Sequence, residues 1–291
     1  MSEPSAPSPT PGVGSWPSLP EPLAVPVPDS HCHLDIAYDA DKHGPGLAVD
    51  DALRQAAAVG VPRVVQVGYD VASSRFGVEV ANRHPQVVAA VALHPNEAPR
   101  LAAGGTWESD FAEICELAAD VRVRAIGETG LDFFRTGPDG RHSQEESFRR
   151  HLRLAKDLDK TLVIHDRDAH DDVVRVLLDE GAPSRVVFHC FSGGAELGAS
   201  CAEHGWFMSF AGPVTFKANQ HLRDVLATAP ADLILVETDA PFLAPLPHRG
   251  RPNASYLIPV TLRAMAEIRK TPVGDLADTV SKNTERAFGA W

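Results

Sequence analysis

Cysteine is scarce in this sequence, and it never occurs in a C-x-x-C spacing. The 291 residues include four cysteines, Cys32, Cys115, Cys190 and Cys201, at irregular intervals. A chain of this length buries enough surface to be stable without covalent cross-links, so we expect reduced thiols rather than a disulfide framework. That state is typical of a cytoplasmic protein.

Long apolar runs and an early basic segment are also lacking. No run approaches the roughly 20 apolar residues that a membrane-spanning helix requires, and the first lysine or arginine is Lys42. A secretory signal needs a basic segment followed by a continuous apolar one, so we expect neither export nor a membrane partner. Nothing in the sequence indicates an obligate protein partner.

Positive charge is in deficit. The 27 Lys and Arg residues are outnumbered by 39 Asp and Glu residues, which gives a formal net charge of −12. This balance argues against a protein that coats nucleic acid through a broad basic face. It does not exclude a nucleic-acid substrate that is held locally, because bound cations or a small arginine cluster reverse the sign inside a cleft.

The first 24 residues are rich in Pro and Ser and have no hydrophobic periodicity. Such a composition cannot bury enough apolar surface to offset the entropy of ordering it, so we expect residues 1–24 to form a disordered extension. No comparable linker occurs later in the chain. Residues 25–291 are therefore expected to fold as one domain.

Short apolar runs rich in β-branched residues alternate with helical patterns along this domain. We expect strands at 23–31, 63–68, 87–93, 123–128, 161–165, 185–189, 206–210 and 233–237. Continuous apolar strands are typical of a parallel sheet buried on both faces, and eight such units predict a TIM-type (β/α)8 barrel. An open doubly wound sheet is the alternative, disfavoured because no G-x-G-x-x-G turn follows the first run.

Three helices are indicated most clearly between these strands. Over 142–158, Ser143 and Glu146 have the spacing of a capping box, and apolar residues recur on one face. The pattern over 169–181 ends at Gly181, which suits a helix C-terminus. A similar apolar stripe covers 256–270.

Five of the eight predicted strands end at, or just before, a residue of a type that binds metal. In a barrel, the carboxyl ends of the strands meet at one mouth, where catalytic residues lie. Any one of these residues alone is more simply a hydrogen-bonded core residue or a cap, but their coincidence at matching strand ends predicts a metal site. The six residues are His31, His33, Glu128, His165, His189 and Asp239.

The segment PDSHCHLD contains the H-x-H pair of this set. Side chains alternate along an extended segment, so His31 and His33 share one face and Cys32 points away. The histidines can therefore share an ion, and Cys32 is expected to be a packing residue rather than a ligand.

The six side chains supply four imidazoles and two carboxylates. This is more than one tetrahedral ion uses, and it suits two divalent ions that share a bridging carboxylate. Mixed N and O donors favour Zn, Mn, Co, Ni or Fe, with Mg where water and phosphate complete the shell. Pairs of such ions are a common device for hydrolysing phosphate esters.

Five motifs in order carry a resemblance to a known family: DSHCHLD, GETGLD, IHDRDAHDD, HCFSGG and ETDAPFLAP. Together they resemble the TatD family of metal-dependent hydrolases, within the amidohydrolase superfamily, over about residues 28 to 290. The resemblance implies that His31, His33 and Asp239 hold one ion, that His165 and His189 hold the other, and that Glu128 bridges them. It also implies that Asp239 accepts a proton from the attacking water, and that single-stranded or end-resected DNA is degraded from 3′ to 5′.

Candidate substrate contacts also follow from the resemblance. His94 in ALHPNEA matches the family's histidine-proline pair, although Asn96 replaces the histidine that often follows it. In LPHRGRPNASYL, Arg249 matches the family's loop and Arg251 replaces its usual lysine. Arg135 is a further candidate for phosphate binding. Glu237 shares a strand face with Asp239, so we expect it to support a ligand rather than bind metal.

Two other functions are compatible with these residues. Barrels of the amidohydrolase type also hydrolyse lactones, amides and phosphotriesters, and some TatD-like proteins are linked to the removal of D-amino acids from tRNA. A non-catalytic nucleic-acid-binding protein with a structural metal is the more distant alternative. It is disfavoured because all six ligands are present.

Overall fold

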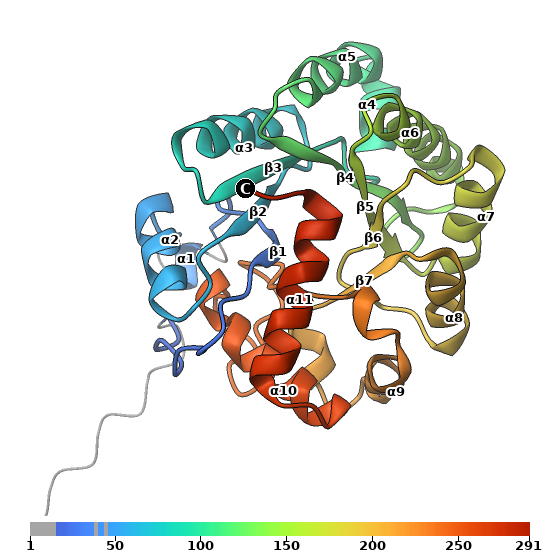
Figure 1. The fold of residues 1–291 in the computed structure, drawn as a ribbon. Helices are drawn as coiled ribbons and strands as arrows, with labels where there is room; N and C mark the ends of the chain where they lie inside the picture. The colour runs from blue at the N-terminus through green and yellow to red at the C-terminus, as the bar shows by residue number, and fades with distance from the viewer. Residues whose placement is uncertain (1–15, 38–39, 44–45) are drawn as a thin grey trace, which may run out of the picture.

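The computed structural model describes residues 16–37, 40–43 and 46–291, which form a barrel of parallel strands surrounded by helices (Figure 1). The strands pair in chain order from the first to the eighth, which confirms the (β/α)8 barrel. They are β1 (Asp29–Cys32), β2 (Val64–Val67), β3 (Val87–Val91), β4 (Val123–Asp132), β5 (Thr161–Arg167), β6 (Val186–Phe188), β7 (Phe207–Phe210) and β8 (Ile234–Val236).

The barrel closes between β1 and the segment that follows β8. Cys32 and Ala240 form a parallel bridge. The Asp239 amide donates to the His31 carbonyl at 2.9 Å, and the His33 amide donates to the Ala240 carbonyl at 2.7 Å. These closing hydrogen bonds hold the two histidines beside the aspartate.

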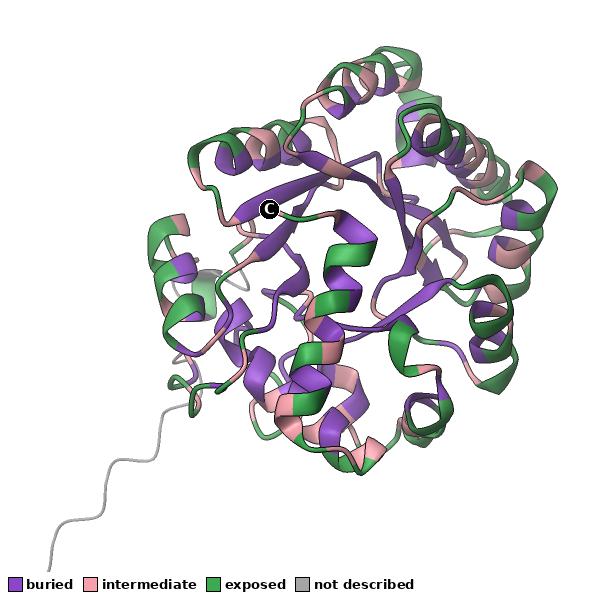
Figure 2. Cartoon of the chain, in the orientation of Figure 1, coloured by how far each residue is buried: buried purple, intermediate pink, exposed green. Residues whose placement is uncertain are grey.

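The helices surround the strands, with their buried faces turned toward the strands and their exposed faces outward (Figure 2). In the described ranges none is both long enough and apolar enough to cross a membrane. They are α1 (Ala40–His43), α2 (Val49–Ala58), α3 (Val71–Arg83), α4 (Glu97–Gly104), α5 (Trp107–Ala118), α6 (Pro138–Asp157), α7 (His170–Glu180), α8 (Ala195–His204), α9 (Gln220–Thr228), α10 (Ile258–Arg269) and α11 (Val273–Phe288).

Helix α11 lies across the end of the barrel at which the strands begin (Figure 1). Arg63, just before β2, pairs with Glu285 at 2.8 Å. At the first residue of β5, the Thr161 hydroxyl donates to the Ala287 carbonyl. This helix covers the amino ends of the strands, so the carboxyl ends form the opposite mouth.

The packed part of the chain begins earlier than the expected boundary at residue 25. Trp16 packs against the core, and Leu23 is buried in it. The Tyr256 hydroxyl donates to the Pro17 carbonyl at 2.8 Å, and the Leu23 amide donates to the Val59 carbonyl at 3.0 Å. Trp16 and Leu23 lie among the prolines and make these contacts, which the overall composition of the segment did not indicate. Residues 1–15 of the expected extension lie outside the described residues.

The expected capping box at Ser143 and Glu146 is wrong. Helix α6 begins at Pro138, which leaves Ser143 and Glu146 inside the helix. Proline suits the first turn because its missing N–H has no partner there and its φ is already helical. Gly181 follows α7 at a positive φ of 72°, as predicted. The expected helix over 256–270 divides into a 3-10 turn (Ser255–Leu257) and α10.

A fully buried histidine in α6 anchors the chain just beyond β3. His151 Nε2 accepts the Leu93 amide at 3.1 Å, and its Nδ1 donates to the Ser147 carbonyl at 2.8 Å. Its ring meets that of Phe111 edge to face, with centroids 5.0 Å apart. Burial lowers the pKa of His151 to about 4. The neutral ring therefore fixes the backbone next to His94.

His151 makes stability depend on pH in a defined window. The unfolded chain protonates this histidine near pH 6.5, whereas the folded chain does so only near pH 4. Between these values the unfolded state binds more protons, so stability falls as pH falls. We expect the stability difference between the wild type and His151→Gln to shrink by about 1.4 kcal/mol per pH unit from 6.5 to 4. Urea unfolding at several pH values measures this, and parallel stability curves would contradict it.

Candidate metal centre

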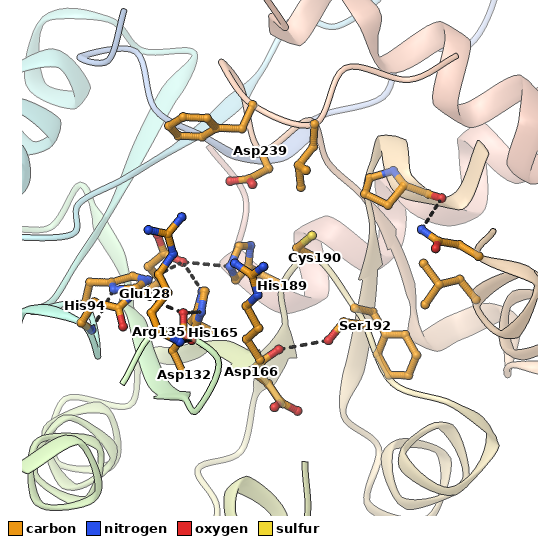
Figure 3. Close-up of a pocket in the computed structure, with 18 of the residues that line it drawn as sticks. His94, Glu128, Asp132, Arg135, His165, Asp166, His189, Cys190, Ser192 and Asp239 are labelled. Carbon is orange, nitrogen blue, oxygen red and sulfur yellow. Dashed lines mark hydrogen bonds and ion pairs between the residues drawn. The ribbon is translucent and has the colours of Figure 1, made fainter. Parts of the chain in front are cut away.

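The six side chains expected to bind metal come together at the mouth of the barrel. Figure 3 shows Glu128, His165 and His189 close to one another, with Asp239 above them in this view. They come from five strands or from the residues that follow them. His31 lies in β1, His33 follows β1, Glu128 lies in β4, His165 lies in β5, His189 follows β6 and Asp239 follows β8.

Two glycines let β4 approach β5 closely around Glu128. A Cβ on Gly127 would lie 2.5 Å from the Cβ of Val163, and one on Gly130 would lie 2.2 Å from the His165 carbonyl oxygen. Gly130 also has a positive φ of 131°, which side chains disfavour. The G-E-T-G segment thus brings Glu128 against His165, because only glycine fits at these two positions.

Glu128 lies at the centre of the cluster. Its Oε2 is 2.8 Å from His189 Nε2, 3.4 Å from His165 Nδ1 and 3.9 Å from His94 Nε2. Its Oε1 is 3.6 Å from His33 Nε2. One carboxylate therefore faces imidazoles from four neighbouring segments, as a bridging ligand would.

Asp239 joins the two histidines of the H-x-H pair. Its Oδ1 is 3.5 Å from His33 Nε2 and 3.7 Å from His31 Nε2. The two Nε2 atoms are 3.3 Å apart. The His31 ring also stacks on that of His189, with centroids 3.9 Å apart. Through this stacking, the residues around Asp239 and those around Glu128 form one continuous cluster.

The donor atoms fit divalent cations. Three groups each place three ligand atoms within 4.8 Å of one another, and buried His31 Nδ1 has no hydrogen-bond partner in the described ranges. Imidazole nitrogen and carboxylate oxygen are ordinary ligands of zinc, manganese and related ions. The groups are His31, His33 and Glu128; His31, His189 and Asp239; and His94, Glu128 and His165.

The electrostatics of the cluster favour a bound cation. Burial opposes ionisation of Glu128, yet His189 helps to hold the pKa of its carboxyl well below the ordinary value. Burial also opposes protonation of His33, but Asp239 and Glu128 raise its pKa to about 9. Burial lowers the pKa of His94 to about 3, so this ring is neutral. The carboxylates thus stabilise positive charge at this mouth.

Comparison with known proteins decides the family. The family model for TatD-related DNases matches residues 28–289. The chain belongs to the TatD family of metal-dependent hydrolases. It is 42% identical, over 267 residues, to the uncharacterized metal-dependent hydrolase TatD of Mycobacterium tuberculosis, and the match covers 90% of this chain and 97% of that protein.

A second relative agrees with this assignment, and a solved structure agrees with the fold. The uncharacterized metal-dependent hydrolase YabD of Bacillus subtilis is 35% identical over 262 residues, covering 89% of this chain and 98% of that protein. The crystal structure of YJJV, a TatD homologue from Escherichia coli, superposes with a TM-score of 0.80 and covers 91% of this chain and 98% of that one. At 24% identity, the YJJV structure supports the fold alone.

Backbone and carboxylate groups orient the histidines of this TatD-family site. His33 Nδ1 lies 2.9 Å from the Val67 carbonyl. Glu237 Oε1 lies 3.3 Å from His189 Nδ1 and accepts the Cys190 amide at 2.6 Å. In both cases the ring nitrogen that faces away from the cluster is engaged, so the other nitrogen points inward.

Asp132 is a site residue that sequence reasoning missed. Its Oδ2 lies 3.1 Å from His165 Nε2 and accepts from Asn96 Nδ2 at 3.1 Å. Its Oδ1 accepts the Arg135 amide at 2.8 Å. The signal was the aspartate of GETGLD, four residues after Glu128. Asp132 therefore fixes the ring of His165 and the loop that carries Arg135.

Removal of the Asp132 carboxylate should weaken metal binding. Partners of this kind usually contribute tenfold to 100-fold in metal affinity, so we expect Asp132→Ala to raise the Kd for Mn²⁺ by about 10- to 100-fold. Asn96→Ala is the matched control, because it removes one hydrogen bond to Asp132 and keeps the carboxylate. Isothermal titration of metal-free protein measures both, and equal Kd values for Asp132→Ala and the wild type would refute this role.

A cavity of about 620 Å³ opens above the cluster. Of the four expected substrate contacts, His94 and Arg135 line it, and both are labelled in Figure 3. Arg249 and Arg251 are not among its lining residues. The Arg249 guanidinium instead lies over the Phe216 ring, 4.6 Å from its centroid. The loop after β8 thus places Arg249 against Phe216 and not in the lining of the cavity.

Proposed function

We propose that this chain is a metal-dependent phosphodiesterase that removes nucleotides from the 3′ end of single-stranded DNA. The observation that carries the proposal is the convergence of two carboxylates and four imidazoles at the mouth of one cavity. The TatD-related DNase family, to which the chain belongs, supports a nucleic-acid substrate. The cavity is lined by this cluster and by Arg135, which forms no ion pair within the described residues, and this lining suits a phosphodiester better than a neutral ester.

The proposed ligand roles are those that the resemblance to the TatD family implies. His31, His33 and Asp239 would hold one divalent ion, His165 and His189 would hold a second, and Glu128 would bridge them. When bound, such ions lower the pKa of water and offset the negative charge on phosphate oxygens.

The chain's own residues would perform three tasks. Arg135 and His94 would bind the nonbridging oxygens of the scissile phosphate, because both side chains line the cavity. Glu128 and the histidines of the cluster would set the orientation of this phosphate. The water that attacks phosphorus would pass its proton to Asp239, as the bond between phosphorus and the 3′ oxygen of the preceding sugar breaks. The departing oxygen would take a proton from solvent.

Two labelled substrates test the proposal. Purified protein with Mn²⁺ or Mg²⁺ is incubated with single-stranded DNA carrying a 3′ or a 5′ label. We expect immediate release of the 3′-labelled nucleotide and a descending ladder from the 5′-labelled strand. A lactone and a phosphotriester serve as competing substrates. Hydrolysis of either of these without DNA cleavage would overturn the proposal and favour a hydrolase of small esters.

A further inference from the structure

Two phenylalanines are exposed, and both are associated with the cavity. Of the twelve in the chain, Phe134 is 63% exposed and Phe242 is 37% exposed. Phe242 lines the cavity. Phe134 lies on the loop between β4 and α6, where the Arg167 guanidinium, which lines the cavity, sits 3.9 Å from its ring centroid. An aromatic face is therefore presented to solvent at the cavity edge.

Hydrogen bonds hold the loop that carries Phe134. The Arg135 amide donates to Asp132 Oδ1 at 2.8 Å, and the Phe133 amide donates to the Arg167 carbonyl at 2.9 Å. The Thr136 hydroxyl accepts from Gln144 Nε2 at 2.7 Å. These bonds fix the loop on both sides of Phe134, so a ligand on the ring would meet a preformed surface.

Arg135 and Arg167 are positively charged groups without a carboxylate partner. Neither forms an ion pair with any residue in the part of the chain that the structure describes. By contrast, Arg149 and Arg175, on α6 and α7, both pair with Glu145 at 2.8 Å. Two guanidinium groups in the cavity lining are therefore not engaged by an ion pair, in a chain with a net charge of −12. These two groups are available to phosphate oxygens.

From these contacts we infer that Phe134 and Arg167 form a platform on which one base of a single-stranded DNA stacks, next to the nucleotide in the cavity. The inference rests on the proposed function and names a second subsite for its substrate. A base would cover the exposed face of Phe134, while Arg167 holds the neighbouring phosphate. Aromatic rings flanked by arginine bind bases of any sequence in this way.

The platform also implies a preference for single strands. Bases within a duplex are stacked on one another and paired, so their faces are not available to a side chain. A flexible strand can turn one base onto Phe134 while its end enters the cavity. A small ester has no group that would reach this ring.

A neighbouring pair supplies a matched control. The Arg141 guanidinium lies 4.0 Å from the Phe133 ring centroid, which repeats the contact between Arg167 and Phe134. Neither Arg141 nor Phe133 lines the cavity. Arg141→Ala removes an equivalent arginine–phenylalanine contact away from the cavity. Any change in DNA binding in this variant would therefore reflect the effect of losing such a contact on folding.

Binding is measured by fluorescence anisotropy of labelled single-stranded DNA, in a Glu128→Gln background so that the DNA is not consumed. We expect Phe134→Ala to raise Kd by about 5- to 100-fold, the range for loss of one stacked base. Phe134→Trp should bind as well as the parent, and Arg167→Ala should weaken binding. Arg141→Ala should leave Kd unchanged.

The substrate provides the second half of the test. A single abasic residue is moved through the four positions nearest the 3′ end of the DNA. At one position, the abasic residue should raise the Kd of the Glu128→Gln protein to the value that Phe134→Ala shows with intact DNA. At that position it should not raise the Kd of the Phe134→Ala variant any further. An equal loss by parent and variant at every position, or an unchanged Kd for Phe134→Ala, would overturn the platform.

Cleavage by the wild-type protein separates this inference from the proposed function. Cleavage without a Phe134 effect would remove the platform and leave the nuclease. Base-dependent binding through Phe134 without cleavage would remove the nuclease and leave the platform. Absence of both binding and cleavage would overturn both.

Discussion

Glu128→Gln is expected to lower the rate of DNA hydrolysis by about 10³-fold or more, because it removes the charge at the centre of the site. The Glu128 carboxylate lies within 3.9 Å of four imidazoles. An amide of the same shape can offer one oxygen to an ion, but it cannot bridge two with a negative charge. The measurement is kcat on labelled single-stranded DNA at saturating Mn²⁺.

Glu237→Gln is the graded comparison for this variant. Glu237 is buried and touches His189, but it belongs to none of the three ligand groups. We expect a loss of about 10- to 100-fold for Glu237→Gln, through weaker metal binding that more Mn²⁺ partly restores. Thermal unfolding confirms that both variants are folded. Turnover near the wild-type value in Glu128→Gln would refute a bridging role.

Asp239→Asn is expected to lower kcat by about 10²- to 10⁴-fold, the usual contribution of a positioned proton acceptor. The side chain is 14% exposed and faces both His31 and His33, so it meets the cavity and the cluster together. Asparagine keeps the shape and one oxygen but cannot take a proton from water. Single-turnover cleavage at saturating enzyme measures the chemical step.

Asp166→Asn is the matched control for Asp239→Asn. Asp166 also lines the cavity, but its Oδ2 lies 2.7 Å from His170 Nδ1 and it joins none of the ligand groups. The same change there should leave most of the activity. If both variants keep their turnover, Asp239 is not the proton acceptor.

The barrel and the convergence of the six ligands could be predicted because both follow from strand periodicity. Eight apolar runs, five of which end in or lie just before a histidine or carboxylate, leave few arrangements other than a parallel barrel with one polar mouth. The hydrogen bonds that close the barrel at His31 and His33 join residues that are far apart in the sequence. They follow only from the barrel itself, whose first and eighth strands must meet.

Asp132 was missed because its role depends on where β4 ends. We expected this strand to stop at Glu128, but it continues to Asp132, where it pairs with β5 up to Arg167. The pairing of Gly130 with His165 brings Asp132 to the outer side of the imidazole. Sequence periodicity could not show this, since two glycines interrupt the apolar pattern.

The loops were the least predictable part of the site. The segment after β8 contains Arg249 and Arg251, but the placement of Arg249 depends on its contact with Phe216, which lies in another loop. The exposed face of Phe134 was equally hidden, because nothing in the pattern LDFFR distinguishes Phe134 from its neighbour Phe133. Tertiary contacts between loops decide such placements, and single-sequence patterns do not encode them.

Metal-free protein titrated with Mn²⁺ provides the most direct test of the dinuclear site. Bound metal per chain and cleavage of 3′-labelled single-stranded DNA are measured on the same samples. We predict no cleavage in the presence of chelator, and a rate that reaches its maximum as the second ion binds. Full cleavage without metal, or a maximum rate with one bound ion per chain, would contradict a dinuclear catalytic site.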